Sequence, residues 1–346
     1  MHLAQLRTSN FRKCRGCGDP LTDANDSAAH IIPNALGGRL APKGIICQTC
    51  NTVLDKLADH ALVEAFGDWP TLLDLPRQRG KNPPKLMDTL NGHRVRMNPD
   101  GTSTRVDVQY DVDSIPEGHL VQIAAGDIKT FRQLLGRVAK QFPQVDVAKA
   151  ERNARTVGIE DGDKLKIRLD FSPDAVFGGA VTAVWLFLIH STGHAFMDWN
   201  RLQDCIANMR ASGGTFRYFV DGLPGLCGPE VGLGYRIVAR SVPSTGELIV
   251  YVEMLGVLKV GGVFARSPVP ALPLEHIYVL DLASKTDRSS EYSIDAAEFE
   301  RQDWGKVGLG PTDAAALRAH FSNAIELFIN HYRNRFTGAP PLPPAQ

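Results

Sequence analysis

Two pairs of cysteines near the N-terminus have the spacing of a metal site. Cys14 and Cys17 form one CxxC, Cys47 and Cys50 form another, and 29 residues separate the pairs. Each CxxC places two thiols on one tight turn, so the pairs together supply the four sulfur ligands of a tetrahedral zinc ion. The sequence therefore predicts a Zn(Cys)4 site. Because four ligands close the coordination shell, this zinc is structural rather than catalytic. The alternative is two unrelated redox or buried pairs.

The stretch between the pairs, AHIIPNALGG at 29 to 38, places a lone histidine at the start of an apolar run. A histidine in such a position more often packs in a core than takes part in chemistry. We expect residues 28 to 33 to form a short strand, 34 to 43 a glycine-rich loop and 44 to 47 a second strand. Apolar residues at helical spacing then predict a helix from 51 to 66. Such a β-hairpin and helix cannot bury a core alone, so a metal ion is the expected support.

Three segments of this region together resemble the HNH endonuclease family. They are Cys14-x2-Cys17, AHIIPNALGG at 29 to 38, and IICQTCN at 45 to 51. The ordered elements CxxC, HIIP, Gly-Gly and CxxCN seldom coincide by chance. The resemblance implies a small ββα-metal (treble-clef-like) fold and hydrolysis of phosphodiester bonds in DNA, although nothing in these residues distinguishes DNA from RNA. It says little about residues 86 to 346.

The resemblance also implies roles for two residues. His30 would be the general base that activates a water molecule, and an imidazole with a pKa near 6.5 suits that task. Asn51 would bind a catalytic divalent cation through its side-chain oxygen, and hard oxygen ligands suit Mg2+ or Mn2+. The alternatives are a packing histidine and a polar residue at a helix end.

The sequence departs from the family pattern at position 29. The family usually has an acidic metal ligand directly before the histidine, and this chain has Ala29. Three explanations stay open: a degenerate, non-cleaving member; Asp26 reaching in from the preceding turn; or an engineered change of Glu or Asp to Ala, which the intact surroundings favour. In a milder departure, Pro42 and Lys43 occupy the region of the family's middle Asn, whose role in fixing the loop would fall to Asn34 or the backbone.

Basic residues gather in and after the cysteine-rich region, although the whole chain has a net charge of zero. They suggest a track for a phosphate backbone, with ordinary solvated surface charge as the alternative. The candidate nucleic-acid-binding residues are Arg15, Arg39, Lys43, Lys56, Arg77, Arg79 and Lys81.

The rest of the chain mixes strands and helices. Strands are expected at 165–171 and near 215, 235, 247 and 276, and helices at 128–142, 174–196, 201–211 and 313–335. Because strands gather in runs, the sequence favours an α+β fold over a doubly wound sheet. We divide the chain into an HNH nuclease domain (1–70), a basic linker containing Pro and Gly (71–92), a larger α+β domain for substrate grip, sensing or assembly (93–336) and a disordered tail (337–346).

Composition indicates a cytoplasmic protein. Hydrophobic residues make up 43% of the 346 residues, enough for a sizeable core. The longest apolar run, 175–189, is shorter than the about 20 residues that span a bilayer, so we expect a buried helix and no membrane partner. Two isolated cysteines, Cys205 and Cys227, are expected to be buried thiols, and His190 and His194 to be core histidines. A homo-oligomer is compatible with these features.

Three hypotheses follow. The first is a metal-dependent HNH endonuclease acting on DNA. Bacterial proteins with such an N-terminal domain are often restriction or phage-defence components. This form would be impaired because Ala29 replaces the acidic ligand. The second is a zinc-stabilised, non-catalytic nucleic-acid-binding module. The third is a nuclease effector gated by a ligand-sensing C-terminal domain.

Overall fold

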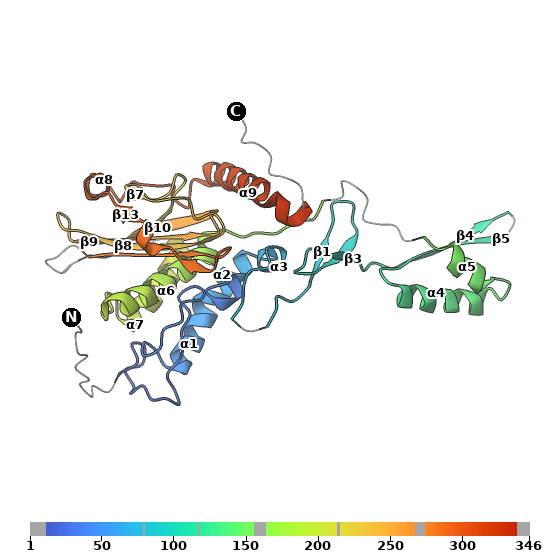
Figure 1. The fold of residues 1–346 in the computed structure, drawn as a ribbon, viewed down its shortest axis with the longest axis horizontal. Coiled ribbons are helices and arrows are strands. Elements are labelled where there is room, and N and C mark those ends of the chain that lie inside the picture. The colour runs from blue at the N-terminus through green and yellow to red at the C-terminus, as the bar shows by residue number, and fades with distance from the viewer. Residues whose placement is uncertain are drawn as a thin grey trace. The chain divides into compact units, whose positions relative to one another are not determined.

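A computed structural model describes residues 12–78, 80–116, 118–155, 164–212, 215–266 and 274–337, which form two compact units (Figure 1). The first unit spans residues 1–66, 76–79 and 169–346, and the second spans 67–75 and 80–168. The cysteine-rich segment therefore shares a unit with the C-terminal half of the chain.

An antiparallel sheet is the centre of the first unit. Its strands are β6 (Phe216–Tyr218), β8 (Gly234–Val242), β9 (Glu247–Met254), β10 (Leu258–Arg266), β11 (Glu275–Asp281) and β12 (Thr286–Asp287). The order is β12-β11-β8-β9-β10-β6, and neighbouring strands are antiparallel. This arrangement confirms the α+β class. Strand β10 was not expected, because its Gly261–Gly262 pair interrupts the strand pattern.

One long apolar helix, α6 (Pro173–Thr192), packs against one face of this sheet (Figure 1). Every side chain from Val176 to Ile189 is buried. Helix α6 is long and apolar enough to cross a membrane, yet 78% of its most apolar window lies inside the protein. Helix α7 (Trp199–Ser212) packs along it, and the Trp185 indole donates a hydrogen bond to the Met197 carbonyl at 2.8 Å. The expected core helix is confirmed.

Aromatic side chains fill the other face of the sheet, beneath the β7 (Leu226–Cys227) and β13 (Ser293–Ile294) ladder and helix α8 (Ala296–Glu300). Phe299 and Trp304 have ring centroids 4.4 Å apart and pack with Tyr251 of β9. The short helix η3 (Ser289–Glu291) precedes β13.

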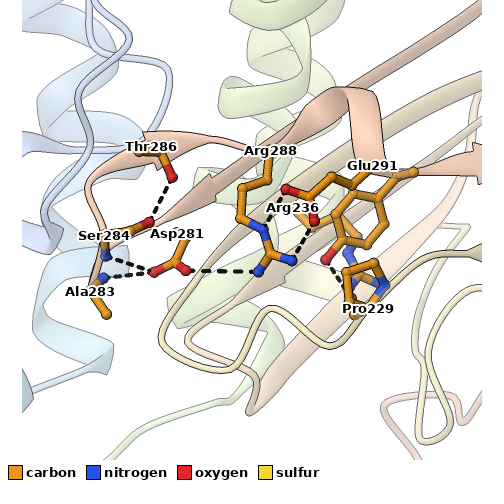
Figure 2. Close-up of polar contacts among 9 residues, drawn as sticks. Pro229, Arg236, Asp281, Ala283, Ser284, Thr286, Arg288 and Glu291 are labelled. Atoms are coloured by element: carbon orange, nitrogen blue, oxygen red, sulfur yellow. Dashed lines mark hydrogen bonds and ion pairs between the residues drawn. The ribbon is translucent and has the colours of Figure 1, made fainter.

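Charged side chains near β12 are paired with one another (Figure 2). Arg288 donates from Nε to Glu291 at 2.9 Å and lies 3.7 Å from the Asp281 carboxylate. The other oxygen of Asp281 accepts the backbone N–H groups of Ala283 and Ser284. These groups hold the β11–β12 turn and the start of η3, so this arginine serves the fold.

Helix α9 (Ala314–Thr337) completes the described part of the first unit. Its Phe321 contacts Tyr218 of β6 and Phe171, with centroid distances of 5.5 and 5.0 Å. Nearly all of the expected tail, from residue 338 onward, lies outside the described residues.

The described residues of the second unit form two small antiparallel ladders and three helices. One ladder joins β1 (Lys85–Asp88), β2 (Arg94–Met97) and β3 (Ser103–Arg105), and the other pairs β4 (Gln109–Ile115) with β5 (Gly118–Ala124). The helices are α3 (Trp69–Leu72), α4 (Ile128–Gln141) and α5 (Val147–Asn153). Asp127 caps α4 as expected, since its carboxylate accepts the Thr130 N–H at 2.9 Å.

Several expectations about this part of the chain differ from the structure. Residues 71–92 contain the second half of α3 and all of β1, so they are not simply a linker. The expected strand at 165–171 is reduced to a bridge between Leu165 and Thr89. The alternation there reflects a segment that leaves one unit and enters the other, where Phe171 packs against Phe66.

Candidate functional site

The four cysteines converge as their spacing predicts. Their Sγ atoms all lie within 4.8 Å of one another, and those of Cys17 and Cys47 are 3.8 Å apart. A zinc ion with Zn–S bonds of about 2.3 Å holds tetrahedral sulfurs about 3.8 Å apart, so the donor set fits zinc. Among the described residues, this is the one group of three or more potential metal-ligating side chains.

Backbone N–H groups organise the cluster. The Cys14 sulfur accepts from the backbone of Gly16 and Cys47, both at 3.3 Å. The Cys47 sulfur caps helix α1 (Gln48–Leu54) by accepting from the Cys50 N–H at 3.5 Å. Gly16 must be small, because a Cβ there would lie 2.5 Å from the Cys50 sulfur. Such N–H donors favour thiolates, the form that binds metal.

The thiols differ in how readily they ionise. Burial raises the pKa of Cys14, but backbone donors, with Cys47 the strongest, outweigh burial and lower it to about 7. Although the Asp19 backbone N–H lowers it, burial and the neighbouring side chains raise the pKa of Cys17 to about 11. Burial, followed by the adjacent thiols, raises the pKa of Cys50. A bound zinc ion must displace these protons, so we expect acid to release it.

The hairpin between the cysteine pairs is present but irregular. Ile31 donates to the Leu40 carbonyl at 2.9 Å and Ala29 to the Pro42 carbonyl at 3.2 Å, yet neither side forms a named strand. The expected strands at 28–33 and 44–47 are therefore wrong as regular elements. Pro33 lacks an N–H, and a short 3-10 helix, η1 (Asn34–Leu36), follows it where only a loop was expected.

The glycine pair has a steric reason. Gly37 ends η1 with a φ of 91°, a left-handed conformation that glycine adopts without strain. A Cβ on Gly38 would lie 1.8 Å from the Ile32 carbonyl oxygen. The two glycines thus let the loop fold back against the apolar run.

Asp26 holds the far side of the hairpin. Its carboxylate accepts the Gly44 N–H at 2.8 Å, and its backbone bridges to Cys47. Asp26 thus fixes the loop before the third cysteine, the role expected of Asn34 or the backbone. Asn34 instead accepts the Gln78 N–H at 3.0 Å.

One ring nitrogen of His30 lacks a hydrogen-bond partner among the described residues. This atom, Nε2, is buried. A buried polar atom without a partner costs about 1–3 kcal/mol, so it calls for a functional explanation. A site that receives a water molecule or an ion provides one.

The neighbouring positions hold one oxygen donor and one methyl group. Ala29 is 0% exposed, so its methyl is packed inside the protein. Asn51 lies in the first turns of α1 and is half-buried. Asn51 offers an oxygen ligand, but no carboxylate stands at position 29, and these residues do not complete a site for Mg2+ or Mn2+.

The helix after the cysteines runs from α1 through a π segment, η2 (Asp55–Asp59), into α2 (His60–Ala65). The expected helix at 51–66 is confirmed, and the π turn is an addition of a kind often found at functional sites. Burial, with a smaller contribution from Asp55, raises the pKa of Asp59 to about 7.

This helix packs against the core of the first unit. A Cβ on Gly179 of α6 would lie 2.6 Å from a Leu62 side-chain carbon, so glycine allows the close approach. The Tyr235 hydroxyl of β8 donates to the Leu36 carbonyl in η1. The segment is therefore supported by residues far away in sequence, rather than forming the separate domain at 1–70 that the sequence suggested.

The candidate nucleic-acid-binding residues have mixed surroundings. Arg39, Lys43, Lys56 and Lys81 are exposed, and Arg79 lies outside the described residues. Arg15 is exposed but donates to the Gly193 carbonyl at the end of α6, at 2.8 Å.

Arg77 is half-buried in the short segment that Gln78 ties to the hairpin loop through Asn34 and the Arg39 carbonyl. Its Nε atom is buried without a hydrogen-bond partner among the described residues. These two hydrogen bonds of Gln78 hold the neighbouring Arg77 backbone close to the loop that follows His30.

Other chemistry-bearing residues stand apart from the site. His190 and His194 are exposed at the end of α6, so the expectation of core histidines is wrong because the helix surfaces there. Cys205 is half-buried, whereas Cys227 is exposed on an edge strand, which corrects the expectation for it.

Sequence reasoning missed three supporting residues: Gln78, Tyr235 and, in its actual role, Asp26. Asp26 has a local signal, since an Asp in a turn often accepts a backbone N–H. Gln78 and Tyr235 bond across 44 and 199 residues, and no local pattern predicts such pairs.

Comparison with known proteins agrees with the resemblance. Residues 14–67 match the family model described as HNH endonuclease. No curated protein and no solved structure matches the chain. The matched residues contain the four cysteines, His30 and Asn51. HNH endonucleases are nucleases, and the match implies a nucleic-acid substrate. The N-terminal part of this chain, residues 14–67, is an HNH endonuclease-type domain that carries a cysteine cluster suited to zinc.

Proposed function

We propose that the chain is a metal-dependent HNH endonuclease that hydrolyses phosphodiester bonds of DNA, in a form impaired by Ala29. The observation that carries the proposal is the family match over residues 14–67, within which the His30 ring nitrogen is buried and unpaired. The intact cysteine cluster supports it, because a structural zinc would hold the hairpin and helix that position this residue.

His30 is the proposed general base. Its Nε2 takes a proton from water, the water oxygen bonds to phosphorus, and the bond from phosphorus to the leaving oxygen breaks. Arg77, whose Nε has no hydrogen-bond partner among the described residues, would bind a phosphate oxygen. Asn51 would contribute one ligand to Mg2+ or Mn2+. Because Ala29 supplies no carboxylate, these residues do not complete the site of that cation.

A cytoplasmic setting and a part in restriction or phage defence belong to the same proposal. Four cysteines arranged for zinc suit a reducing compartment, where thiols are not lost to disulfides. The defence role is supported by the resemblance to bacterial proteins with this front end, and it is the least direct part of the proposal.

A second candidate function is a zinc-stabilised module that binds nucleic acid without cleaving it. The observation in its favour is the full burial of Ala29, which shows a position packed as an apolar residue. The two candidates differ in what a carboxylate at position 29 would do.

The test is a supercoiled-plasmid nicking assay with Mg2+ or Mn2+, run on the chain, on Ala29→Glu and on Ala29→Gln. Gln matches the size of Glu without its charge. Metal-dependent nicking by Ala29→Glu alone is the expected result, and a parallel assay on single-stranded RNA separates the substrates. If Ala29→Glu folds, retains zinc and cleaves neither substrate, the non-catalytic module replaces the nuclease.

A further inference from the structure

A basic helix face in the second unit stands outside all the residues considered so far. Helix α4 carries Lys129, Arg132, Arg137 and Lys140 and has no Asp or Glu. All four basic residues are exposed. We infer that this face is a binding surface for the sugar-phosphate backbone of a nucleic acid, an inference that rests on the proposed function for its substrate class.

Helix α4 is amphipathic. Leu134, Leu135 and Val138 are buried. At about 100° per residue, Lys129, Arg137 and Lys140 fall within one quadrant on the opposite side. Residues 129 and 140 are about 16 Å apart along the axis, so the cations form a row that can contact several phosphates of one strand.

The acidic residues near this helix are already engaged or face away. Glu151 of α5 pairs with Arg132, whose Nε donates to it at 2.7 Å. Asp127 and Asp146 cap α4 and α5 by accepting backbone N–H groups at 2.9 Å.

Two further carboxylates, those of Asp111 and Asp113, belong to β4. The Tyr110 hydroxyl donates to Gln141 of α4 at 2.9 Å, so this face of β4 is turned towards the helix. Alternate residues of a strand point to opposite faces, and Asp111 and Asp113 therefore point away from α4. In the part of the chain that the structure describes, Lys129, Arg137 and Lys140 form no ion pair.

A glycine in the middle of the basic face gives independent support. Gly136 is exposed, its φ is not positive, and a Cβ there would meet nothing within 4 Å. Glycine lowers the stability of a helix interior relative to alanine, and neither packing nor backbone conformation requires it here. Close approach of a ligand backbone to the helix is a reason for it, since a bulkier residue would hold a phosphate strand away.

The basic face and the candidate active site belong to different units. Helices α4 and α5 and the β4–β5 hairpin all belong to the second unit (Figure 1), whereas His30 and the cysteines belong to the first. The inferred surface thus adds grip on the substrate without contributing to the chemistry.

The experiment measures equilibrium binding of the full chain, loaded with zinc, to a fluorescent DNA duplex without added Mg2+ or Mn2+, across a salt series. The test variant is Lys129→Ala/Arg137→Ala/Lys140→Ala. The control is Arg301→Ala/Lys306→Ala, whose side chains are exposed and paired with Glu298 and Asp303 in the first unit. Each lost phosphate contact lowers the slope of log K against log salt by about 0.9, so we expect a reduction of about 2–3 and at least about tenfold weaker binding near 0.15 M salt.

A second variant, Gly136→Leu, tests close approach. It should raise the helix content or thermal stability while weakening DNA binding, a combination that damage to the fold does not produce. Binding to anionic phospholipid vesicles, measured in parallel, tests whether the basic face instead binds a membrane surface.

Binding by the triple variant that equals that of the chain, absence of DNA binding by the chain, or binding to vesicles alone would each overturn the inference. Because metal-dependent cleavage needs the Mg2+ or Mn2+ that this assay omits, this result is independent of the nicking assay. Helix α4 can bind DNA even if Ala29→Glu fails to cleave it. Equally, Ala29→Glu can cleave DNA even if helix α4 does not bind it.

Discussion

The HNH-type domain holds two sites that differ in completeness. The cysteine cluster has all four ligands, with sulfurs at distances suited to zinc. At the other site, the His30 Nε2 atom has no hydrogen-bond partner among the described residues, Asn51 offers one oxygen donor, and Ala29 stands where the family usually has an acidic ligand. If His30 is the general base that we propose, the support of the fold and the cleavage chemistry are separable, because the domain has kept all ligands of one site and lacks one of the other. Changes at the two sites should therefore affect different properties.

The largest expected effect is loss of zinc. Cys50→Ser, or a strong chelator, should destabilise the first unit by at least about 3 kcal/mol, because structural zinc contributes directly to folding. Thermal unfolding combined with zinc analysis measures this. Cys227→Ser is the control, since that thiol is exposed and isolated. An unfolding temperature that is the same with and without the chelator would show that the cysteine cluster does not support the fold.

The next largest effect is expected at position 29. Without a divalent cation, Ala29→Glu should lower stability by about 2–3 kcal/mol, because it buries a carboxylate that has no partner. Mn2+ should recover most of that loss in Ala29→Glu and none in Ala29→Gln. Thermal shift with and without Mn2+ makes the comparison. Equal responses from both variants would mean that no cation binds beside His30.

A pH series examines the helix shared by the two sites. The pKa of Asp59 is about 7 in the folded chain and near 3.9 when unfolded. The folded state holds this proton more tightly, so the contribution to stability is present below pH 4 and lost as pH rises through 7.

Asp59→Asn should therefore raise stability by about 1–2 kcal/mol at pH 8 and change it little at pH 4. This is less than the full shift implies, because the carboxyl is partly solvated. Denaturant unfolding at both pH values measures the effect. A gain of the same size at both would contradict the raised pKa.

The smallest expected effect is at the hairpin loop. Asp26→Ala leaves the Gly44 N–H without its acceptor and should cost about 1 kcal/mol. The exposed Asp23 provides the control through Asp23→Ala. In the Ala29→Glu background, nicking should also fall. If Asp26→Ala keeps full stability and full nicking activity, Asp26 does not hold the hairpin loop in place.

The sequence predicted those features whose cause is local. The CxxC spacing predicted the cluster, the apolar spacing predicted the helix after Asn51, and Asp127 predicted the start of α4. It failed where distant segments decide the structure. Tyr235 reaches Leu36 across 199 residues, and the chain leaves the first unit after Phe66, returns to it for residues 76–79 and re-enters it at Leu169. The domain boundaries follow these long-range contacts, and no local sequence pattern predicts such contacts.

The central claim is that His30 acts on a phosphodiester bond once position 29 carries a carboxylate. The most direct measurement is metal-dependent plasmid nicking by Ala29→Glu and by Ala29→Glu/His30→Ala, with folding and zinc content checked for both. The account predicts cleavage by the single variant and a loss of at least about a hundredfold in the double variant. Cleavage that persists without His30, or its absence from both folded, zinc-bound proteins, would contradict it.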